Sequence, residues 1–489
     1  MDRRRVGPVA ALLLLALVAS VLSACSDDDA GATSVVETAA GKLRGTTHDG
    51  IRSFRGIPYA EAPVGDLRWA EPRPPAPWDG ERDATAYRSA CMQSTYSPLG
   101  PVPATVKDTS EDCLFLNVNR PDDDSEDLPV IVYVHGGGFM VGTGSDETSN
   151  APPLVRRGVV VVTLNYRLGR LGFFAHPSLR GDVANFGLLD QVAALEWVRD
   201  NIQEFGGDPG NVTLFGSSAG GMSVNALMAS PRAAGLFDRA ITQSGLGREE
   251  SQPLAEARAA AGMRDASLAD LRALDAETVM RAPLNAFAGD VPIIDGGVLP
   301  APVAEVFAAG DEADVPYLVG TTDLEFPDAD LVQRGFDAAQ LRGDLTGADA
   351  ARLVAAYGGA ADFEQHFFSD AVFTEPARFL ATAHAERAPT YLYRFSIASP
   401  ATLEAVGGAV HSSDIAYVFG TTEDELADTI GDYWVAFAGS GDPNHAGAPE
   451  WPAADGGALL ALTVDGPVAA AVDPWRRRLD AVRRLADAR

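Results

Sequence analysis

The sequence predicts an α/β protein whose central sheet is mainly parallel, with helices on both faces. Continuous apolar runs at residues 129–134, 159–164 and 212–215 are typical of strands buried on both sides. Between the second and third runs, apolar residues recur at spacings of three and four over residues 188–205, which indicates a helix. Glycine-rich segments follow the first and third runs. In such sheets, sites lie at the carboxyl ends of the strands, so these two segments are the first places to look for chemistry.

An antiparallel arm is predicted at the N-terminal edge of this sheet. Residues 34–57 alternate apolar and polar side chains around the turn signal Asp49-Gly50. Residues 111–118 are predicted to form a strand that carries Cys113. Because no internal repeat or hinge-like linker interrupts the pattern, residues 35–489 are interpreted as a single domain.

The second half of the chain continues the alternation of strands and helices. Short segments at 240–244, 315–320 and 391–395 are predicted to form three further strands. Residues 246–290 and 327–385 are alanine-rich and helical in pattern, and they carry no motif. We expect these two segments to cover the site and to shape a substrate pocket.

The N-terminus has the features of an export signal. Three arginines at 3–5 precede an apolar run at 9–22, which is shorter than the roughly 20 residues that span a bilayer comfortably. The run ends in Leu22-Ser23-Ala24-Cys25, which is similar to a bacterial lipobox. It predicts a signal peptide over residues 1–24, an acylated Cys25 and a polar tether over 25–34. The mature protein would then be anchored by lipid to the extracytoplasmic side of a bacterial membrane, the alternative being an ordinary secretory peptide.

Charge and cysteine content narrow the possible partners and the compartment. A formal charge of −30 disfavours nucleic acids and anionic lipid headgroups as partners. The chain has three cysteines, an odd number for an exported protein. If Cys25 is acylated, Cys91 and Cys113 remain as a pair whose bridge would add about 3 kcal/mol by loop closure. The alternative is two buried free thiols.

The pentapeptide 216–220, Gly-Ser-Ser-Ala-Gly, lies between a predicted strand and a predicted helix. This is the context of a nucleophile elbow, a turn so sharp that Ser218 must adopt a strained backbone and Gly216 and Gly220 cannot carry side chains. The alternative is a Gly/Ser-rich turn without chemistry. The motif alone does not decide between the two.

A glycine triplet, Gly136-Gly137-Gly138, follows the predicted strand at 129–134. Its backbone N–H groups are free of side-chain cover and could bind an anionic oxygen, as an oxyanion hole requires. A flexible turn is the plainer alternative. A dinucleotide loop is excluded because the G-x-G-x-x-G spacing into a helix is absent.

A serine nucleophile needs a base that is oriented by a third group. Behind a nucleophile elbow, the acid precedes the histidine in the chain. His411 is favoured as the base because it lies in a loop that follows the strand at 391–395, whereas the contexts of three other downstream histidines indicate packing, surface or turn positions: His366, His384 and His445. The acid should follow the strand at 315–320, where sequence alone leaves both Asp323 and Glu325 open.

Several longer motifs follow one another along the chain: residues 54–60, 111–114, 205–209 before the elbow, and 411–415 followed by 418–420. Together, and in this order, they resemble the motifs of the type-B carboxylesterase family over most of residues 35–475. The resemblance implies an α/β-hydrolase fold and a serine enzyme that hydrolyses small-molecule carboxylic esters. It implies no metal and no cofactor.

The resemblance also assigns roles residue by residue. It implies that Ser218 is the nucleophile, His411 the general base and acid, and Glu325 the orienting carboxylate. It further implies that the oxyanion is bound by the backbone N–H groups of Gly137, Gly138 and Ala219. It also implies a disulfide between Cys91 and Cys113.

The chain departs from the family pattern at positions that bear on the chemistry. Ser217 stands where the family usually has Glu, which removes a buried carboxylate that would favour charged substrates. Leu324 and Phe326 replace the usual Asp and Gly around the acid, so Asp323 stays open as the triad carboxylate. Two alternatives to an ester hydrolase are a catalytically inactive binding or adhesion module on the same fold, and a thioesterase or amidase with the same triad.

Overall fold

The computed structural model describes residues 32–93, 106, 108–150, 152–248, 251–281, 291–327 and 345–488. The predicted signal peptide and Cys25 lie outside these residues. In the part of the chain that is described, no helix combines the length and the apolar character needed to cross a membrane.

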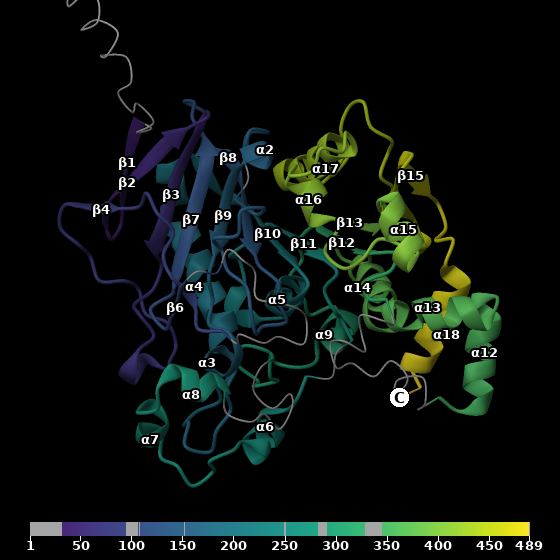
Figure 1. Ribbon diagram of the computed structural model, residues 1–489, viewed down its shortest axis with the longest axis horizontal. Helices are drawn as coiled ribbons and strands as arrows, with labels where there is room; N and C mark the ends of the chain where they lie inside the picture. The colour runs from purple at the N-terminus through teal and green to yellow at the C-terminus, as the bar shows by residue number, and fades with distance from the viewer. Residues whose placement is uncertain are drawn as a thin grey trace, which may run out of the picture.

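Three antiparallel strands form the N-terminal edge of the sheet: β1 (Ala32–Thr38), β2 (Gly41–His48) and β3 (Ile51–Pro58). The two residues between β2 and β3, Asp49 and Gly50, both have positive φ, as a two-residue hairpin turn that matches strand twist requires. The predicted arm is therefore confirmed (Figure 1). It begins at Ala32, so the last residues of the predicted tether belong to β1.

The central sheet has the strand order β1-β2-β3-β7-β9-β8-β10-β11-β12-β13-β14-β15. All neighbouring pairs from β9 to β14 are parallel, and the flanking pairs β7–β9 and β14–β15 are antiparallel. The mostly parallel α/β sheet predicted from the sequence is thus confirmed. The strands are β7 (Phe115–Pro121), β8 (Leu128–Val134), β9 (Val160–Leu164), β10 (Gly207–Ser217), β11 (Arg239–Gln243), β12 (Tyr317–Thr322), β13 (Thr390–Phe395), β14 (Leu459–Thr463) and β15 (Gly466–Ala470).

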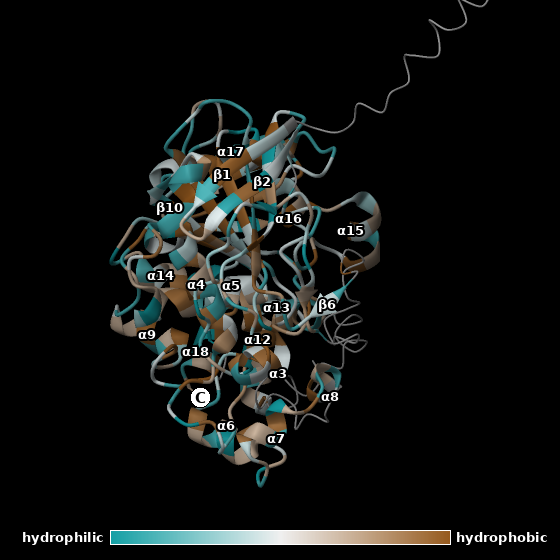
Figure 2. Cartoon of the chain, turned by 90° about the vertical axis from the view of Figure 1, so that its left-hand side faces the viewer, coloured by the Kyte–Doolittle hydropathy of each residue, from teal (hydrophilic) through white to brown (hydrophobic). Residues whose placement is uncertain are grey.

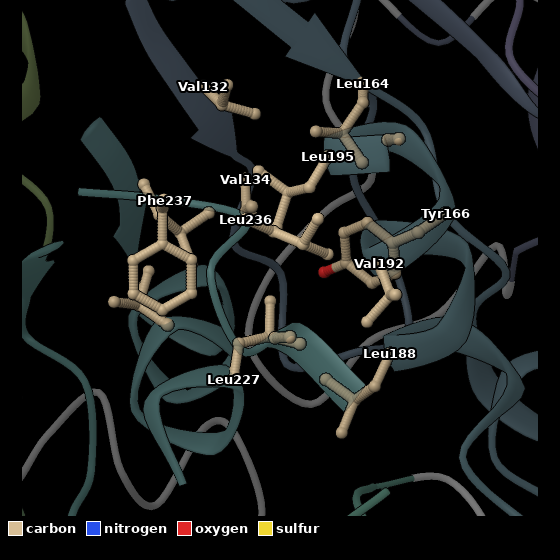
Figure 3. Packing of buried hydrophobic residues seen from close by; sticks show 14 of the residues in the cluster. Val132, Val134, Leu164, Tyr166, Leu188, Val192, Leu195, Leu227, Leu236 and Phe237 are labelled. Atoms are coloured by element: carbon tan, nitrogen blue, oxygen red, sulfur yellow. The ribbon is translucent and has the colours of Figure 1, made fainter. Parts of the chain in front are cut away.

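Each face of the sheet has its own hydrophobic core, because successive strand residues point to opposite sides. Val132 and Val134 of β8 pack with α4 (Phe186–Asn201) and α5 (Ala219–Met228), as Figure 3 shows. These two helices lie side by side (Figure 2). The alternate residues Ile131 and Tyr133 pack on the other face with α17 (Leu426–Ser440). Helices therefore cover both faces, as predicted.

The alanine-rich segments are helical where they are described. Short helices α6, α7 and α8 lie together at one end of the molecule, and α12 and α13 lie beside α18 (Figure 1). A π-helical turn at Asp370–Thr374 joins α13 to α14. The bounds are α6 (Leu254–Ala260), α7 (Leu268–Arg272), α8 (Ala276–Arg281), α9 (Val303–Ala309), α12 (Gly347–Tyr357), α13 (Ala360–Ser369), α14 (Glu375–His384), α15 (Pro400–Val406), α16 (Ile415–Val418) and α18 (Arg476–Ala486).

The predicted disulfide between Cys91 and Cys113 is present, with an S–S distance of 2.03 Å and a Cα–Cα distance of 4.9 Å. The strand predicted at 111–118 is displaced, since β7 begins only at Phe115. The preceding residues are held by other contacts: the bridge fixes Cys113, and the Arg68 guanidinium binds the Glu111 carboxylate through two hydrogen bonds. These contacts, and not a strand ladder, fix the chain that enters the sheet.

Candidate active site

The pentapeptide forms a sharp turn from β10 into α5, with Ser218 at the corner. Ser218 has φ 57° and ψ −124°, a conformation that a residue with a side chain adopts only under constraint. Its N–H donates to the carbonyl of Gln243 on the neighbouring strand, at 2.8 Å. The constraint is thus supplied by the sheet, and the Ser218 side chain is presented at the carboxyl end of β10.

The glycines that flank the serine are required by close backbone contacts. A Cβ at Gly216 would lie 2.3 Å from the backbone of Gly220. A Cβ at Gly220 would lie 2.0 Å from the carbonyl oxygen of Val134. Neither distance is tolerated by real atoms, so the turn can close only with glycine at both positions.

His411 lies in the loop between α15 and α16, beyond the end of β13, and reaches the serine across the sheet. Its Nε2 lies 2.8 Å from the Ser218 Oγ. Its backbone N–H donates to the carbonyl of Glu325 at 2.8 Å, which ties the loop to the segment that follows β12. Nucleophile and base, 193 residues apart in sequence, are therefore in hydrogen-bonding contact.

Glu325 is the carboxylate that contacts the imidazole. Its Oε2 lies 2.5 Å from Nδ1 of His411. Its Oε1 accepts hydrogen bonds from the Ser244 hydroxyl at 2.7 Å and from the Thr322 N–H at 2.9 Å. The carboxylate is fully buried, and its orientation is fixed on both oxygens. Ser244 was not identified from the sequence, although its place directly after β11, beside the elbow strand, was a signal for it.

Asp323, the other carboxylate left open by the sequence, has a different partner. Its Oδ1 accepts the N–H of Ala409 at 2.6 Å, and its backbone N–H donates to the carbonyl of Phe395. Burial raises the pKa of Asp323. Glu325, and not Asp323, contacts the His411 ring. Asp323 instead stabilises the loop that carries His411, through its hydrogen bond with Ala409.

Aromatic rings pack against the imidazole. The ring of Phe326 stacks on His411 with a centroid distance of 4.6 Å, and Phe373 of the π-helical turn lies 5.3 Å away. Phe326 is one of the two departures from the family pattern around the acid. Phe373 comes from an alanine-rich segment without motifs, so no sequence pattern predicted its position.

The glycine triplet makes a tight turn after β8 beside the elbow. Gly137 and Gly138 have φ of 107° and 62°, and a Cβ at Gly137 would lie 1.9 Å from the Val141 carbonyl oxygen. A Cβ at Gly136 would lie 3.0 Å from the Cβ of Ser218, so the triplet and the nucleophile are adjacent. The cavity beside the turn has a volume of about 320 Å³ and includes Ser412, the residue after His411, in its lining.

His135, which precedes the triplet, is neutral near pH 7. Burial lowers the pKa of His135 to about 4, and its ring stacks on Tyr166 with a centroid distance of 4.5 Å. Its Nδ1 lies 2.8 Å from the Gly136 carbonyl oxygen, so the neutral ring donates there and helps to fix the turn.

The three other downstream histidines have partners elsewhere. His384 is buried between the Glu312 carboxylate and the Val315 carbonyl, each at 2.7 Å. His366 contacts the backbone of its own helix, and His445 contacts the neighbouring Ala446 carbonyl. Within the described residues, no cluster of three or more potential metal ligands is found.

Comparisons with known proteins agree with this geometry. A sequence profile of the carboxylesterase family matches residues 32–329 and 359–470. The chain is 37% identical to the para-nitrobenzyl esterase of Bacillus subtilis (strain 168), over 90% of this chain and 96% of that protein. It is 34% identical to the fumonisin B1 esterase of Sphingopyxis macrogoltabida, over 92% and 89% of the two chains.

A mammalian relative and a solved structure point the same way. Carboxylesterase 1E of Mus musculus is 34% identical, over 91% of this chain and 92% of its own. The structure of a PNB esterase superposes with a TM-score of 0.78 at 35% identity and covers 92% of this chain and 99% of that one. With this fold and this agreement along its length, the chain belongs to the carboxylesterase family of α/β-hydrolases and is a serine carboxylic ester hydrolase.

Proposed function

We propose that ester hydrolysis proceeds through an acyl intermediate on Ser218, with His411 as general base and acid and Glu325 as the orienting carboxylate. The observation that carries the proposal is the continuous hydrogen-bonded series from Ser218 Oγ through both ring nitrogens of His411 to Glu325. In this arrangement, Nδ1–H donates to the carboxylate. Nε2 is then left as an acceptor, which is the tautomer that a base for the serine requires.

The reaction follows from these positions in two halves. Ser218 Oγ attacks the ester carbonyl carbon while His411 Nε2 takes its proton, and the proton then passes to the departing alkoxide, which leaves as the alcohol. In the second half, His411 takes a proton from water as the water oxygen attacks the acyl carbon. The Ser218 oxygen leaves as the carboxylic acid forms, and the proton returns to it. Glu325 stabilises the imidazolium in both halves.

Backbone N–H groups of Gly137, Gly138 and Ala219 bind the carbonyl oxygen as it becomes negative. Ala219 is the first residue of α5, so its N–H has no partner within the helix. The tight turn of the triplet beside Ser218 supports the same role for the two glycines. One such donor contributes about 3 kcal/mol of barrier lowering.

The substrate is a small-molecule ester with an apolar group. Phe326 and Phe373 pack beside His411, and the partly buried Leu246, Phe368 and Val372 extend that apolar cluster. The name of the para-nitrobenzyl esterase, a relative of 37% identity, is consistent with such a substrate. A binding-only role is not favoured, because all members of the series are present and in contact.

The experiment that tests this function is labelling of the full chain with a fluorophosphonate probe. Ser218 should be modified in a one-to-one ratio, and the modified peptide should be identified by mass spectrometry, because only an activated serine attacks phosphorus rapidly. Ser217, the adjacent hydroxyl, is the internal control and should stay unmodified. Labelling of another residue, or no labelling of folded protein, would overturn the assignment.

We further propose that the protein is exported and anchored by a lipid on Cys25. The basic start, the short apolar run and the lipobox-like sequence support this proposal. The described disulfide also suits an oxidising compartment. The lipid would hold the domain outside the cytoplasm, at the surface of a bacterial membrane.

Replacing Cys25 with Ser should move the protein from the membrane fraction to the soluble fraction, or leave an unprocessed precursor, because no acyl acceptor remains. Fractionation followed by an esterase assay measures the distribution. Cys91→Ser is the matched control: it removes a different cysteine and should leave the distribution unchanged. An unaltered membrane fraction in Cys25→Ser would contradict the lipid anchor.

A further inference from the structure

A row of side chains crosses the sheet directly behind the proposed nucleophile. Ser217, Gln243, Gly320 and Tyr393 are aligned neighbours on β10, β11, β12 and β13. Paired residues on adjacent strands point to the same face of a sheet. A Cβ at Gly320 would lie only 2.2 Å from the Tyr393 ring, so the glycine provides the space in which that ring lies over β12.

Asp414, at the start of α16 and three residues after His411, closes this row. It is only 1% exposed. Its Oδ2 accepts hydrogen bonds from the Gln243 side-chain amide and from the Tyr393 hydroxyl, each at 2.7 Å. The row therefore ties the base-bearing loop to the strand next to the elbow.

Two oxygens of this buried pair have no hydrogen-bond partner among the described residues: Oδ1 of Asp414 and Oε1 of Gln243. They belong to groups that are already joined through the Gln243 amide and Asp414 Oδ2. Two unpaired acceptors on one such pair are costly when buried, and more so when one of them carries a charge. A single proton on Oδ1, donated to Oε1, would satisfy both oxygens at once.

We propose that Asp414 and Gln243 form a buried proton-binding site, in which a carboxylic acid proton on Asp414 Oδ1 bonds to Gln243 Oε1. We further propose that Asp414 is a positioning residue, because its protonation determines whether a negative charge lies behind the loop that carries His411. The second statement rests on the proposed function of His411, whereas the first does not. The proton comes from solvent at low pH and returns to it as the pH rises.

The charges around Asp414 agree with such a site. The pKa of Asp414 is raised to about 6, mainly by burial and in part by the nearby Glu325 carboxylate, against the lowering effect of the Tyr393 and Gln243 hydrogen bonds and of His411. Tyr133 and Tyr393, the other titratable groups that face it, have raised pKa values and stay neutral. The charge on Asp414 therefore changes in the mildly acidic range.

The effect on stability has a definite sign. Asp414 has a higher pKa when folded, about 6, than its ordinary value of 3.8. The folded state therefore binds more protons between these values, and the resulting stabilisation is fully present below pH 3.8 and is lost as the pH rises through 6. Asp414→Asn should abolish this dependence, since its amide group can donate to Gln243 Oε1 at every pH.

The first experiment compares the unfolding equilibrium of Ser218→Ala with that of Ser218→Ala/Asp414→Asn between pH 4 and pH 7.5. The ratio of their unfolding constants should change by roughly 60-fold over this range, as a shift of the Asp414 pKa from 3.8 to about 6 requires. Because neither protein is catalytically competent, the result is independent of the triad assignment. An equal pH dependence of the two proteins would overturn the proton site. The same result is expected if an internal water donates a hydrogen bond to the ionised carboxylate instead.

The second experiment records kcat/KM against pH with the serine intact. The Asp414→Asn profile should lose one titration near pH 6, while Tyr393→Phe should move that titration to higher pH, because the ionised carboxylate loses a hydrogen bond. A merely structural role would lower activity evenly without moving the profile. Three superimposable profiles would overturn the positioning role even if Ser218 labelling succeeds.

Discussion

Replacing Ser218 with Ala is expected to lower kcat/KM for a short-chain p-nitrophenyl ester by on the order of 10⁶-fold. The loss should be this large because the covalent route disappears and the remaining backbone donors can only assist attack by water. His411 and Glu325 act through the serine and have no other nucleophile to activate. Initial rates on the purified full chain provide the measurement.

Ser217→Ala is the matched control for this substitution. Ser217 precedes the nucleophile and is 1% exposed, and its Oγ makes no hydrogen bond to any residue that the structure describes. Removal of the Ser217 hydroxyl should change kcat/KM by less than about tenfold, because the substitution breaks no hydrogen bond that holds the site. Substantial turnover by folded Ser218→Ala, checked for trace contamination by active-site titration, would show that another residue is the nucleophile.

The second large effect is expected at the triad acid. Glu325→Gln should lower kcat by on the order of 10³- to 10⁴-fold, because an amide at this position can donate to Nδ1 and favour the tautomer whose Nε2 carries a proton. That nitrogen could then not accept the proton of Ser218. Steady-state kinetics on saturating ester, with thermal unfolding to verify the fold, tests the expectation.

Asp323→Asn is the matched comparison, an acid-to-amide change two residues away. The Asn oxygen can still accept the N–H of Ala409, so the brace on the loop persists. We expect less than about a tenfold loss of kcat. A larger loss in Asp323→Asn than in Glu325→Gln would mean that the hydrogen bond between Glu325 and His411 is not the one that operates in catalysis.

Much of the site can be predicted from short stretches of sequence, because its parts are turns whose residues are close together in the chain. The elbow needs a strand, a serine between two glycines and a helix, and all of these lie within residues 212–228. The glycine triplet after β8 is equally self-contained. His411 was found by its place after a strand, which reflects the rule that loops at the carboxyl ends of parallel strands meet.

The remaining features depend on contacts between distant segments. Spacing could not separate Asp323 from Glu325, because the choice is made by the Ala409 N–H and the His411 ring, both contributed by the loop before α16. The pairing of Gln243 with Asp414 spans 171 residues. Phe373 reaches the imidazole from a segment whose composition indicated only a helix. Such positions are set by packing, which no short window of sequence contains.

The order of the triad residues along the chain also determines when during synthesis the enzyme can first become active. A chain made through the segment that follows β12 already has the elbow, the triplet and Glu325. The histidine follows the serine by 193 residues and is added only after β13. Until residue 411 has been added and docked, the nascent chain has no base. Products of early termination before that point are therefore inert toward esters, even though they carry the whole elbow.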